Sequence, residues 1–445
     1  MSTAVASTAI VAAKTISKIK GHILPLLFLF YIVAYLDRIN IGFAAFTMTQ
    51  ELRITSAQYG FLTGIFFWGY FLFEIPSNLI LHKMGARLWI ARILVTWGVI
   101  AMLGGLVHSV SQLYVVRFLL GVAEAGFFPG IVLYLTYWFR QREQAQMVAL
   151  FLTGLPVATI VGAPLSGIIL DHVHWLGSSS WRWLFVLEGL PAIGCGFLTW
   201  FLLPNRPADA QFLCPEEKMW IAEELRQEDR RKSASHGSTG LQALTNPRVW
   251  HLAGISFTYL IGLYAMSFWM PQAVKQLAQD CSNTLLGVLV MAPHVVGMAA
   301  MILVSRHSDR TLERRYHATI PLIAGSVALM LLSNTGSIWM ALALWAVIAA
   351  GIYSFLGPFW ALPSEFLSGL SAAAGIAFIN SIGNLGGFVG PSAIGILTKH
   401  FGGMSTGLRL VGFSLLISAV LLLLLPKAKR QCGVTEGTMA DMTTI

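Results

Sequence analysis

The sequence predicts an all-α membrane protein with twelve transmembrane helices in two pseudo-symmetric six-helix bundles. Of its 445 residues, 56% are hydrophobic and only 11% are charged, whereas an ordinary soluble domain is about 25% charged. Apolar segments of about 20 residues, the length that crosses a bilayer, recur along the chain. One long polar segment near the middle divides these apolar segments into two sets of six. Internal repetition of this kind is typical of secondary transporters.

The predicted spans follow one another through short connections on either side of the polar segment. That segment opens with proline turns, predicts a short amphipathic helix from Pro215 to Arg230, and ends in a Ser/Gly stretch typical of a flexible linker. The spans are expected at about residues 23–46, 57–81, 88–107, 113–136, 145–170, 182–203, 248–272, 284–305, 317–333, 337–360, 370–397 and 407–425. The chain is therefore divided into an N-terminal tail (1–22), an N-terminal bundle (23–203), a linker (204–247), a C-terminal bundle (248–425) and a C-terminal tail (426–445).

The distribution of Lys and Arg predicts the orientation in the membrane. If both termini are cytoplasmic, most of these residues fall in cytoplasmic segments, and only Arg53, Arg182, Lys275, Lys399 and Arg409 fall outside. This asymmetry also accounts for the net charge of +9, so the basic balance indicates topology and lipid contact and no nucleic-acid partner. In the first twenty residues the charges follow the apolar part, which favours a cytoplasmic tail over a signal peptide. The four cysteines have no CxxC spacing, so no disulfide framework or metal site is expected.

The stretch YLDRIN places Asp37 and Arg38 side by side within the first span. A charge at the middle of a bilayer costs about 2.5 to 3.5 kcal/mol on insertion scales, so both residues must face partners or water. A guanidinium presents a planar fork that a carboxylate matches with two hydrogen bonds, which makes Arg38 the candidate substrate binder. Asp37 is a candidate proton carrier. The alternative is that both residues form ion pairs that hold the bundle together.

The fourth span contains a second pair of charged residues in RFLLGVAEAGFFPG. Arg117 and Glu124 are seven residues apart and share a helix face, and Gly121 between them permits the close approach of a neighbouring helix. Burial and a nearby Arg act oppositely on a carboxyl group, so a change of conformation can load or release its proton. Glu124 is therefore the principal proton-coupling candidate, whereas Arg117 is assigned to a structural charge network.

Several polar and aromatic side chains are further candidates. Glu74 lies four residues after Tyr70, near the predicted cytoplasmic end of the second span, and is expected to serve a gate or a helix contact. In the tenth span two prolines, Pro358 and Pro363, are expected to interrupt the helix. Glu188 is a further intramembrane carboxyl with no assigned role. The expected substrate-binding residues are Arg38, Tyr35, Tyr70, Trp360, Asn380 and Asn384, with helix packing as the alternative role of the two asparagines.

The stretches YLDRINIGFA, GYFLFEIPSNLILHKMGAR, RFLLGVAEAGFFPGIVLYLTYWF and SDRTLERR together resemble the major facilitator superfamily. Within it they are similar to the anion:cation symporter family, in the branch of bacterial tartrate, phthalate and 4-hydroxyphenylacetate permeases. The resemblance implies that Asp37 and Glu124 are the two protonation sites and that Arg38 moves between Glu124 and the bound anion. Asp309 and Arg310 match the family's cytoplasmic loop motif in its second copy and are expected to serve gating. The first copy has His82 in place of the usual Asp.

These features predict a transporter with no enzymatic activity, since HExxH, the zinc-binding motif of metalloproteases, does not occur in the chain. The expected activity is proton-coupled uptake of a small organic carboxylate, such as tartrate, another hydroxy or sugar acid, or an aromatic acid. An organic-anion exchanger and a non-transporting anion receptor remain alternatives. No cofactor beyond the proton gradient and no metal is expected. The expected partners are the carboxylate, protons and the bilayer, with the chain a monomer in the bacterial cytoplasmic membrane.

Overall fold

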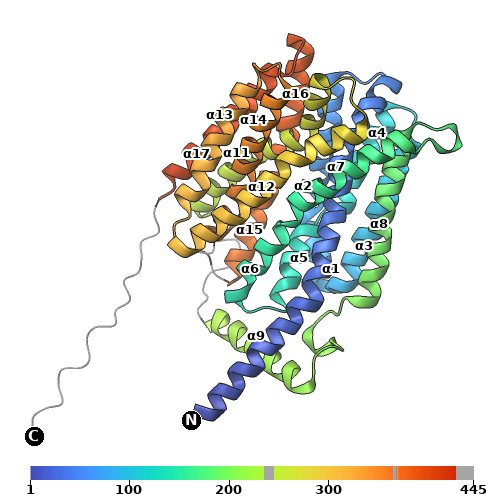
Figure 1. Ribbon diagram of the computed structural model, residues 1–445. Helices are drawn as coiled ribbons and strands as arrows, with labels where there is room; N and C mark the ends of the chain where they lie inside the picture. Colours follow the sequence, from blue (N-terminus) through green and yellow to red (C-terminus); the bar gives the residue numbers. More distant parts are fainter. Residues whose placement is uncertain (1, 235–244, 364–366, 368, 427–445) are drawn as a thin grey trace, which may run out of the picture.

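The computed structural model describes residues 2–234, 245–363, 367 and 369–426, and the regular structure in these residues is helical (Figure 1). The first half contains α1 (Ser2–Glu51), α2 (Ser56–Met84), α3 (Ala86–Leu103), η1 (Gly104–Leu106), α4 (Val110–Glu124), α5 (Phe127–Thr136), α6 (Gln141–Leu152), α7 (Gly154–His172), η2 (Trp175–Gly177) and α8 (Ser180–Leu202). The connection that follows contains η3 (Pro207–Asp209) and α9 (Pro215–Ala234). The second half contains α11 (Pro247–Leu277), α12 (Asn283–Thr311), α13 (Arg315–Leu332), α14 (Ile338–Ala361), α15 (Gly369–Asn384), α16 (Gly386–Phe401) and α17 (Ser405–Leu424).

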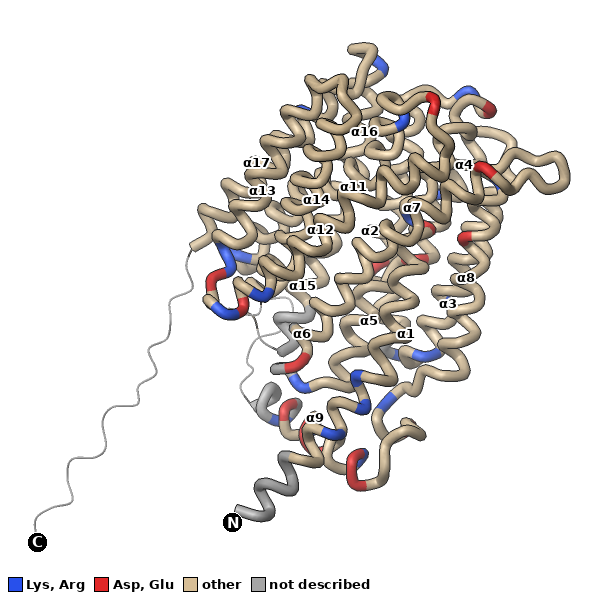
Figure 2. Tube along the Cα trace, in the orientation of Figure 1, with Lys and Arg blue, Asp and Glu red and all other residues tan. Residues whose placement is uncertain are grey.

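Eleven segments in the described residues are long and apolar enough to cross a membrane. The remaining predicted span, 370–397, falls on α15 and α16, each of which has only 16 residues. Large apolar side chains such as Phe201 and Trp339 are about three-quarters exposed on these helices, as expected for surfaces that face lipid. Charged residues gather toward the two ends of the molecule (Figure 2). The predicted all-α membrane fold is confirmed.

Three predicted spans are each built from two helices. Between α4 and α5, Gly126 has φ of 84°, a left-handed conformation that glycine adopts without steric cost. Between α6 and α7, Pro156 lacks the N–H that would continue the helical hydrogen bonding across Thr153. In contrast, α14 passes through Pro358 without a break and ends at Ala361, before Pro363. The expectation that both prolines interrupt this span was therefore wrong for Pro358.

The helices pack into two groups that meet chiefly along three pairs of helices. In the first half α1 packs on α7 and α8, α3 packs on α8, and α2 packs on α4. In the second half α11 packs on α15, α16 and α17, and α14 packs on α12 and α13. The halves meet where α7 packs on α12, α2 on α16 and α1 on α11.

Close backbone contact between the halves occurs at the end of the molecule away from α9, which we call the far end. A Cβ atom on Gly167 of α7 would collide with the carbonyl oxygen of Asn283 on α12, and one on Gly287 would collide with that of Ala163. Gly60 of α2 approaches the backbone at Pro391 of α16 in the same way. Only glycine permits this spacing, so these positions determine how tightly the far end closes.

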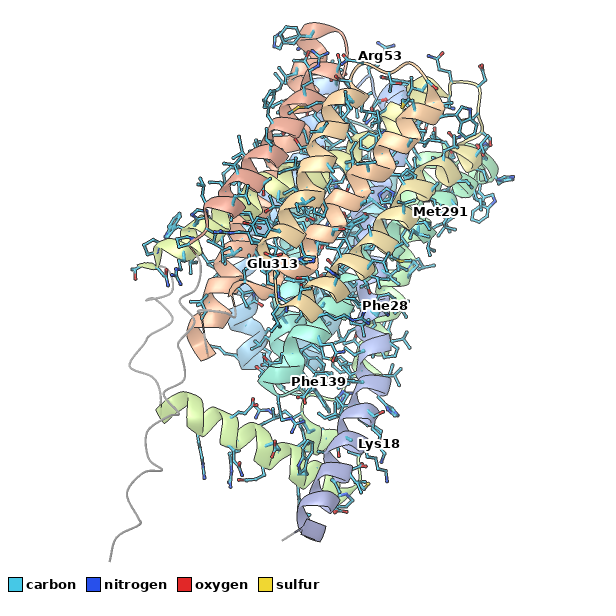
Figure 3. All side chains as sticks on the ribbon, turned by 60° about the vertical axis from the view of Figure 1, so that its left-hand side comes forward. Lys18, Phe28, Arg53, Phe139, Met291 and Glu313 are labelled. Atoms are coloured by element: carbon cyan, nitrogen blue, oxygen red, sulfur yellow. The ribbon has the colours of Figure 1, made fainter. Side chains whose placement is uncertain are left out.

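The opposite end, which we call the α9 end, joins the linker helix to the start of α1. The helix predicted from Pro215 to Arg230 is α9, and residues 2–22 are helical and continuous with the first span. Lys18, labelled on α1 in Figure 3, forms an ion pair with Glu217 at 2.7 Å. Desolvation raises the pKa of Glu217, but hydrogen bonds from Cys214 and Lys18 outweigh it and lower the pKa to about 2. Residues 235–244 of the linker and 427–445 of the predicted C-terminal tail lie outside the described residues.

Candidate functional site

Arg38 lies at the centre of the molecule and bonds to both halves. One guanidinium nitrogen, Nη2, forms an ion pair with Glu124 of α4. The other, Nη1, donates a hydrogen bond of 2.9 Å to the hydroxyl of Tyr264 on α11. That hydroxyl donates in turn to Oδ1 of Asn384 on α15 at 3.2 Å. A chain of hydrogen bonds therefore connects α4, α1, α11 and α15.

Aromatic rings surround the same guanidinium. The Cζ atom of Arg38 lies 5.2 Å from the ring centre of Phe66, 5.8 Å from that of Tyr70, 5.9 Å from that of Tyr35 and 6.0 Å from that of Tyr264. Such contacts favour a cation, each by roughly 0.5 to 2 kcal/mol. These rings therefore compensate part of the positive charge of Arg38, in addition to the ion pair with Glu124. A second carboxylate that approached it would compete directly with Glu124.

Glu124 is the last residue of α4, and its side chain is 2% exposed. The close approach expected at Gly121 is present, since a Cβ atom there would collide with the carbonyl oxygen of Phe66 on α2. This contact holds α4 against α2 and brings Glu124 to Arg38. The burial of Glu124 makes its charge dependent on Arg38, because a lone buried carboxylate is strongly disfavoured in a membrane interior.

Asp37 is directed away from Arg38, as expected for neighbouring residues that lie about 100° apart around a helix. Its Oδ2 accepts a hydrogen bond of 2.9 Å from Nε1 of Trp97 on α3, and its Oδ1 has no hydrogen-bond partner. Arg117 is buried on the same face of α4 as Glu124 but does not bond to it. Its guanidinium lies 5.5 Å from the ring centre of Phe66 and interacts electrostatically with Asp37.

Glu74 links the halves on the α9 side of Arg38. Its Oε1 accepts from Nδ2 of Asn380 at 2.8 Å, and its Oε2 accepts from Oγ of Ser381 at 2.5 Å. Glu74 lies on α2 and both donors lie on α15, so all three buried groups belong to the contact between the halves. Asn380 is therefore occupied by a protein carboxylate, whereas Asn384 belongs to the hydrogen-bond chain of Arg38.

The remaining predicted residues divide between the centre and the surface. The hydroxyl of Tyr35 shares a hydrogen bond of 3.0 Å with Ser267 of α11. Trp360 stands across the halves from Phe128 of α5, with ring centres 6.3 Å apart. Asp309 and Arg310 are exposed at the end of α12, where Asp309 forms an ion pair with Arg314. They do not join the central cluster and belong to the connection between α12 and α13.

Sequence reasoning missed Tyr264, Ser267, Ser381 and Trp97. A signal was present for two of them. Tyr264 and Ser267 are three residues apart in the seventh span, as Tyr35 and Arg38 are in the first. The first span opens the first half of the chain, and the seventh span opens the second half. If the halves are structural repeats, the repeated spacing indicates that these residues occupy equivalent positions in the two halves. Among the described residues, no group of three or more His, Cys, Asp or Glu side chains could hold a metal ion.

Fold and site together define a multi-span membrane protein with a buried cluster of charged and aromatic side chains between two helical halves. Residues 27–391 match the model of the Major Facilitator Superfamily, and the chain belongs to that family. It is therefore a multi-pass membrane transporter for a small molecule and is not an enzyme.

Named relatives and a solved structure agree with this assignment. A protein of Agrobacterium vitis named "Putative tartrate transporter" is 44% identical over 94% of this chain and 92% of its own length. The "Inner membrane transport protein RhmT" of Escherichia coli is 37% identical over 86% of this chain and 89% of its own length. The crystal structure of a bacterial homologue of the human lysosomal transporter Spinster, inward-facing and unoccupied, has a TM-score of 0.72 at 19% identity, and covers 91% of this chain and 96% of that one.

Proposed function

We propose that this chain is a proton-coupled symporter that takes up a small organic carboxylate by alternating access. It acts in the bacterial cytoplasmic membrane, with the α9 end in the cytoplasm and the far end outside. The N-terminal bundle (23–203) and the C-terminal bundle (248–425) rock against each other around a site between them. The linker (204–247) and both tails lie in the cytoplasm. The substrate is tartrate or another hydroxy, sugar or aromatic acid.

The ion pair of Arg38 with Glu124 is the observation that carries the proposal. Arg38 has one carboxylate partner and no second one among the described residues. If Glu124 takes up a proton, it no longer compensates Arg38, and the guanidinium accepts a substrate carboxylate through its planar fork. Release of substrate returns Arg38 to Glu124 and expels the proton. Proton binding and substrate binding are thus coupled by competition for one guanidinium.

The other central groups support this cycle in distinct ways. Asp37, next to Arg38 in the chain, is the second proton site. Tyr35, Tyr70 and Trp360 form the walls around the substrate, and Asn384 positions Arg38 through Tyr264. Asn380 reaches the substrate when Glu74 releases it, so Glu74 and Asn380 serve as a gate on the cytoplasmic side. Arg117 compensates the negative charge of Asp37. Asp309 and Arg310 stabilise the cytoplasmic turn between α12 and α13.

The test uses purified protein in liposomes that contain a pH-sensitive dye. Tartrate, galactonate, phthalate and 4-hydroxyphenylacetate are added outside in turn, and acidification of the interior is followed. Glu124→Gln should abolish substrate-dependent acidification, because the amide cannot release a proton. Glu223→Gln, on the exposed surface of α9, is the matched control and should behave like the unmodified protein.

Other outcomes would overturn the proposal in recognisable ways. Uptake of labelled substrate without acidification, and only with substrate trapped inside, would identify an exchanger. Binding without uptake would identify a receptor. Acidification with none of the four acids, together with no binding of any of them, would exclude the proposed substrate class.

A further inference from the structure

Glu188 of α8 is a buried carboxyl that the cycle above does not use. Its side chain is 3% exposed, and its Oε1 accepts a hydrogen bond of 2.7 Å from Oγ of Ser166 on α7. Its Oε2 has no hydrogen-bond partner, and no Lys or Arg in the described part of the chain forms an ion pair with it. A single hydroxyl does not compensate a full charge in a membrane interior, so Glu188 holds a proton in this conformation.

Glu188 has Asp37 as an acidic neighbour. The two carboxyls interact electrostatically across the contact of α1 with α8. Asn40, three residues after Asp37 and therefore on the same side of α1, lies beside Glu188. Asn40 is 1% exposed, and among the groups around it the Glu188 carboxyl is the partner that its amide approaches. Buried polar groups are nearly always paired, so this run of three buried polar side chains, with unpaired carboxyl oxygens at Asp37 and Glu188, is a sign of function.

The charged and titratable groups around this run come from helices of the first half, α8 included. Arg117 of α4 and Cys195 of α8 both interact electrostatically with Asp37. Trp97 of α3 and Ser166 of α7 contribute only neutral donors. Arg117 therefore faces Asp37, and no Lys or Arg among the described residues forms an ion pair with Glu188. Two neighbouring carboxylates repel each other, and one nearby cation compensates only one of their charges. The state in which the pair shares one proton is therefore favoured over the state in which both are ionised.

The depth of these residues follows from an ion pair at the far end. Nη2 of Arg182 on α8 lies 2.9 Å from Oε1 of Glu51 on α1, which fixes the two helices in register. With a rise of 1.5 Å per residue, Glu188 is about 9 Å below this pair, Asn40 about 16 Å and Asp37 about 21 Å. Glu188 thus lies between Asp37 and the outer end of the helices.

We propose that Glu188 is a third proton-binding carboxyl of the transport cycle and exchanges its proton with Asp37 on the outer side of the site. The O–H bond of the Glu188 carboxyl breaks as one forms on the Asp37 carboxylate, so the charge of the pair is unchanged. Glu188 is then protonated again from outside. This inference rests on the proposed proton-coupled transport and assigns the path by which Asp37 receives its proton.

The experiment measures substrate accumulation in liposomes as a function of the imposed pH gradient, using the acid that acidifies the interior with unmodified protein. Glu188→Gln should still exchange labelled for unlabelled substrate, which demonstrates a folded and mobile transporter. It should accumulate about tenfold less substrate per unit of pH gradient, as loss of one coupled proton requires. Glu188→Asp retains the carboxyl and should recover the accumulation. An unchanged accumulation and pH profile in Glu188→Gln would overturn the proposal. The amide resembles a carboxyl that stays protonated, so an unchanged profile would mean that Glu188 never releases its proton during transport.

A second variant covers the case in which Glu188→Gln does not fold. Ser166→Ala removes the hydroxyl that favours the charged form of Glu188, so half-maximal proton-driven uptake should move by about half a pH unit or more toward alkaline pH. A profile identical to that of the unmodified protein would contradict the proposal. If the unmodified protein moves no protons with any substrate, the proposed function fails first. If it moves them and both variants leave the profile unchanged, only the role of Glu188 fails.

Discussion

Asp171 and Thr284 join the two halves at the far end, where Oδ2 of Asp171 accepts hydrogen bonds of 2.7 Å from both the backbone N–H and the hydroxyl of Thr284. The Oδ1 atom accepts from the backbone and the side-chain amide of Asn283. Asp171 lies in the last turn of α7, and its two partners are the first residues of α12. The carboxylate therefore also faces the positive end of the α12 dipole, and we expect it to hold the outer side closed.

Replacement of Asp171 by Asn should favour opening of the outer side. The amide nitrogen cannot accept from Thr284, and the attraction to the helix dipole is lost. Hydrogen bonds to charged groups contribute about 1.5 to 3 kcal/mol each, so the closed population should fall at least several-fold. Spin labels at the outer ends of α7 and α12 should report a longer distance. Asp280→Asn, an exposed carboxylate nearby, is the control, and an unchanged distance in Asp171→Asn would refute the role of the carboxylate.

Gly167→Val should prevent the outer side from closing. Any Cβ atom at this position collides with the backbone carbonyl of Asn283, which has no flexible side chain to move aside. Transport should therefore be lost while the purified protein stays folded, as measured by its melting temperature in detergent. Gly194→Val is the matched control, since nothing lies within 4 Å of a Cβ atom there. Full transport by Gly167→Val would mean that the close contact of α7 with α12 is dispensable.

Arg38→Lys should weaken substrate binding by more than tenfold although the charge is retained. The ammonium group lacks the planar fork and loses contact with the surrounding rings. Isothermal titration with the transported acid gives the dissociation constant directly. Arg92→Lys provides the comparison, because Arg92 stacks on Trp89 of α3, at 3.8 Å from the ring centre. Equal loss in both variants would indicate a general effect on the fold.

The contact of α9 with α1 should be lost in acid. The pKa of Glu217 is lowered from 4.5 to about 2 in the folded protein, so its contribution is fully present above about pH 4.5 and disappears as the pH falls toward 2. Hydrogen–deuterium exchange of α9 should accelerate across that window. Glu217→Gln should exchange rapidly at every pH, whereas Glu216→Gln, on the exposed side of the helix, should retain the pH dependence. If the exchange rate of α9 in the unmodified protein did not depend on pH, the assigned role of Glu217 in this contact would be contradicted.

The sequence indicated which charged residues form the central site, but it did not indicate which side chains they bond to. Arg38 was predicted to face partners or water because a lone charge is too costly in a bilayer, and in the structure it forms an ion pair with Glu124. Arg117 was placed on the same face as Glu124 by helical spacing, yet the two do not bond. Asn380 was expected to meet the substrate or to serve helix packing, and in this conformation it donates to Glu74, a partner that the sequence did not indicate. Helical periodicity indicates the face of the helix on which a residue lies, but it does not indicate which side chain of another helix lies opposite.

The sequence by itself determined the membrane fold, the spans and the set of buried charges, because bilayer thickness and the cost of burying charge act on each segment separately. Only the tertiary structure decided which charges meet. Tyr264 reaches Arg38, Asp171 reaches Thr284 and Glu188 lies above Asp37 through contacts between helices distant in the chain. Such contacts depend on how whole helices are rotated and stacked. Small residues such as Gly121 and Gly167 set that packing jointly with their neighbours.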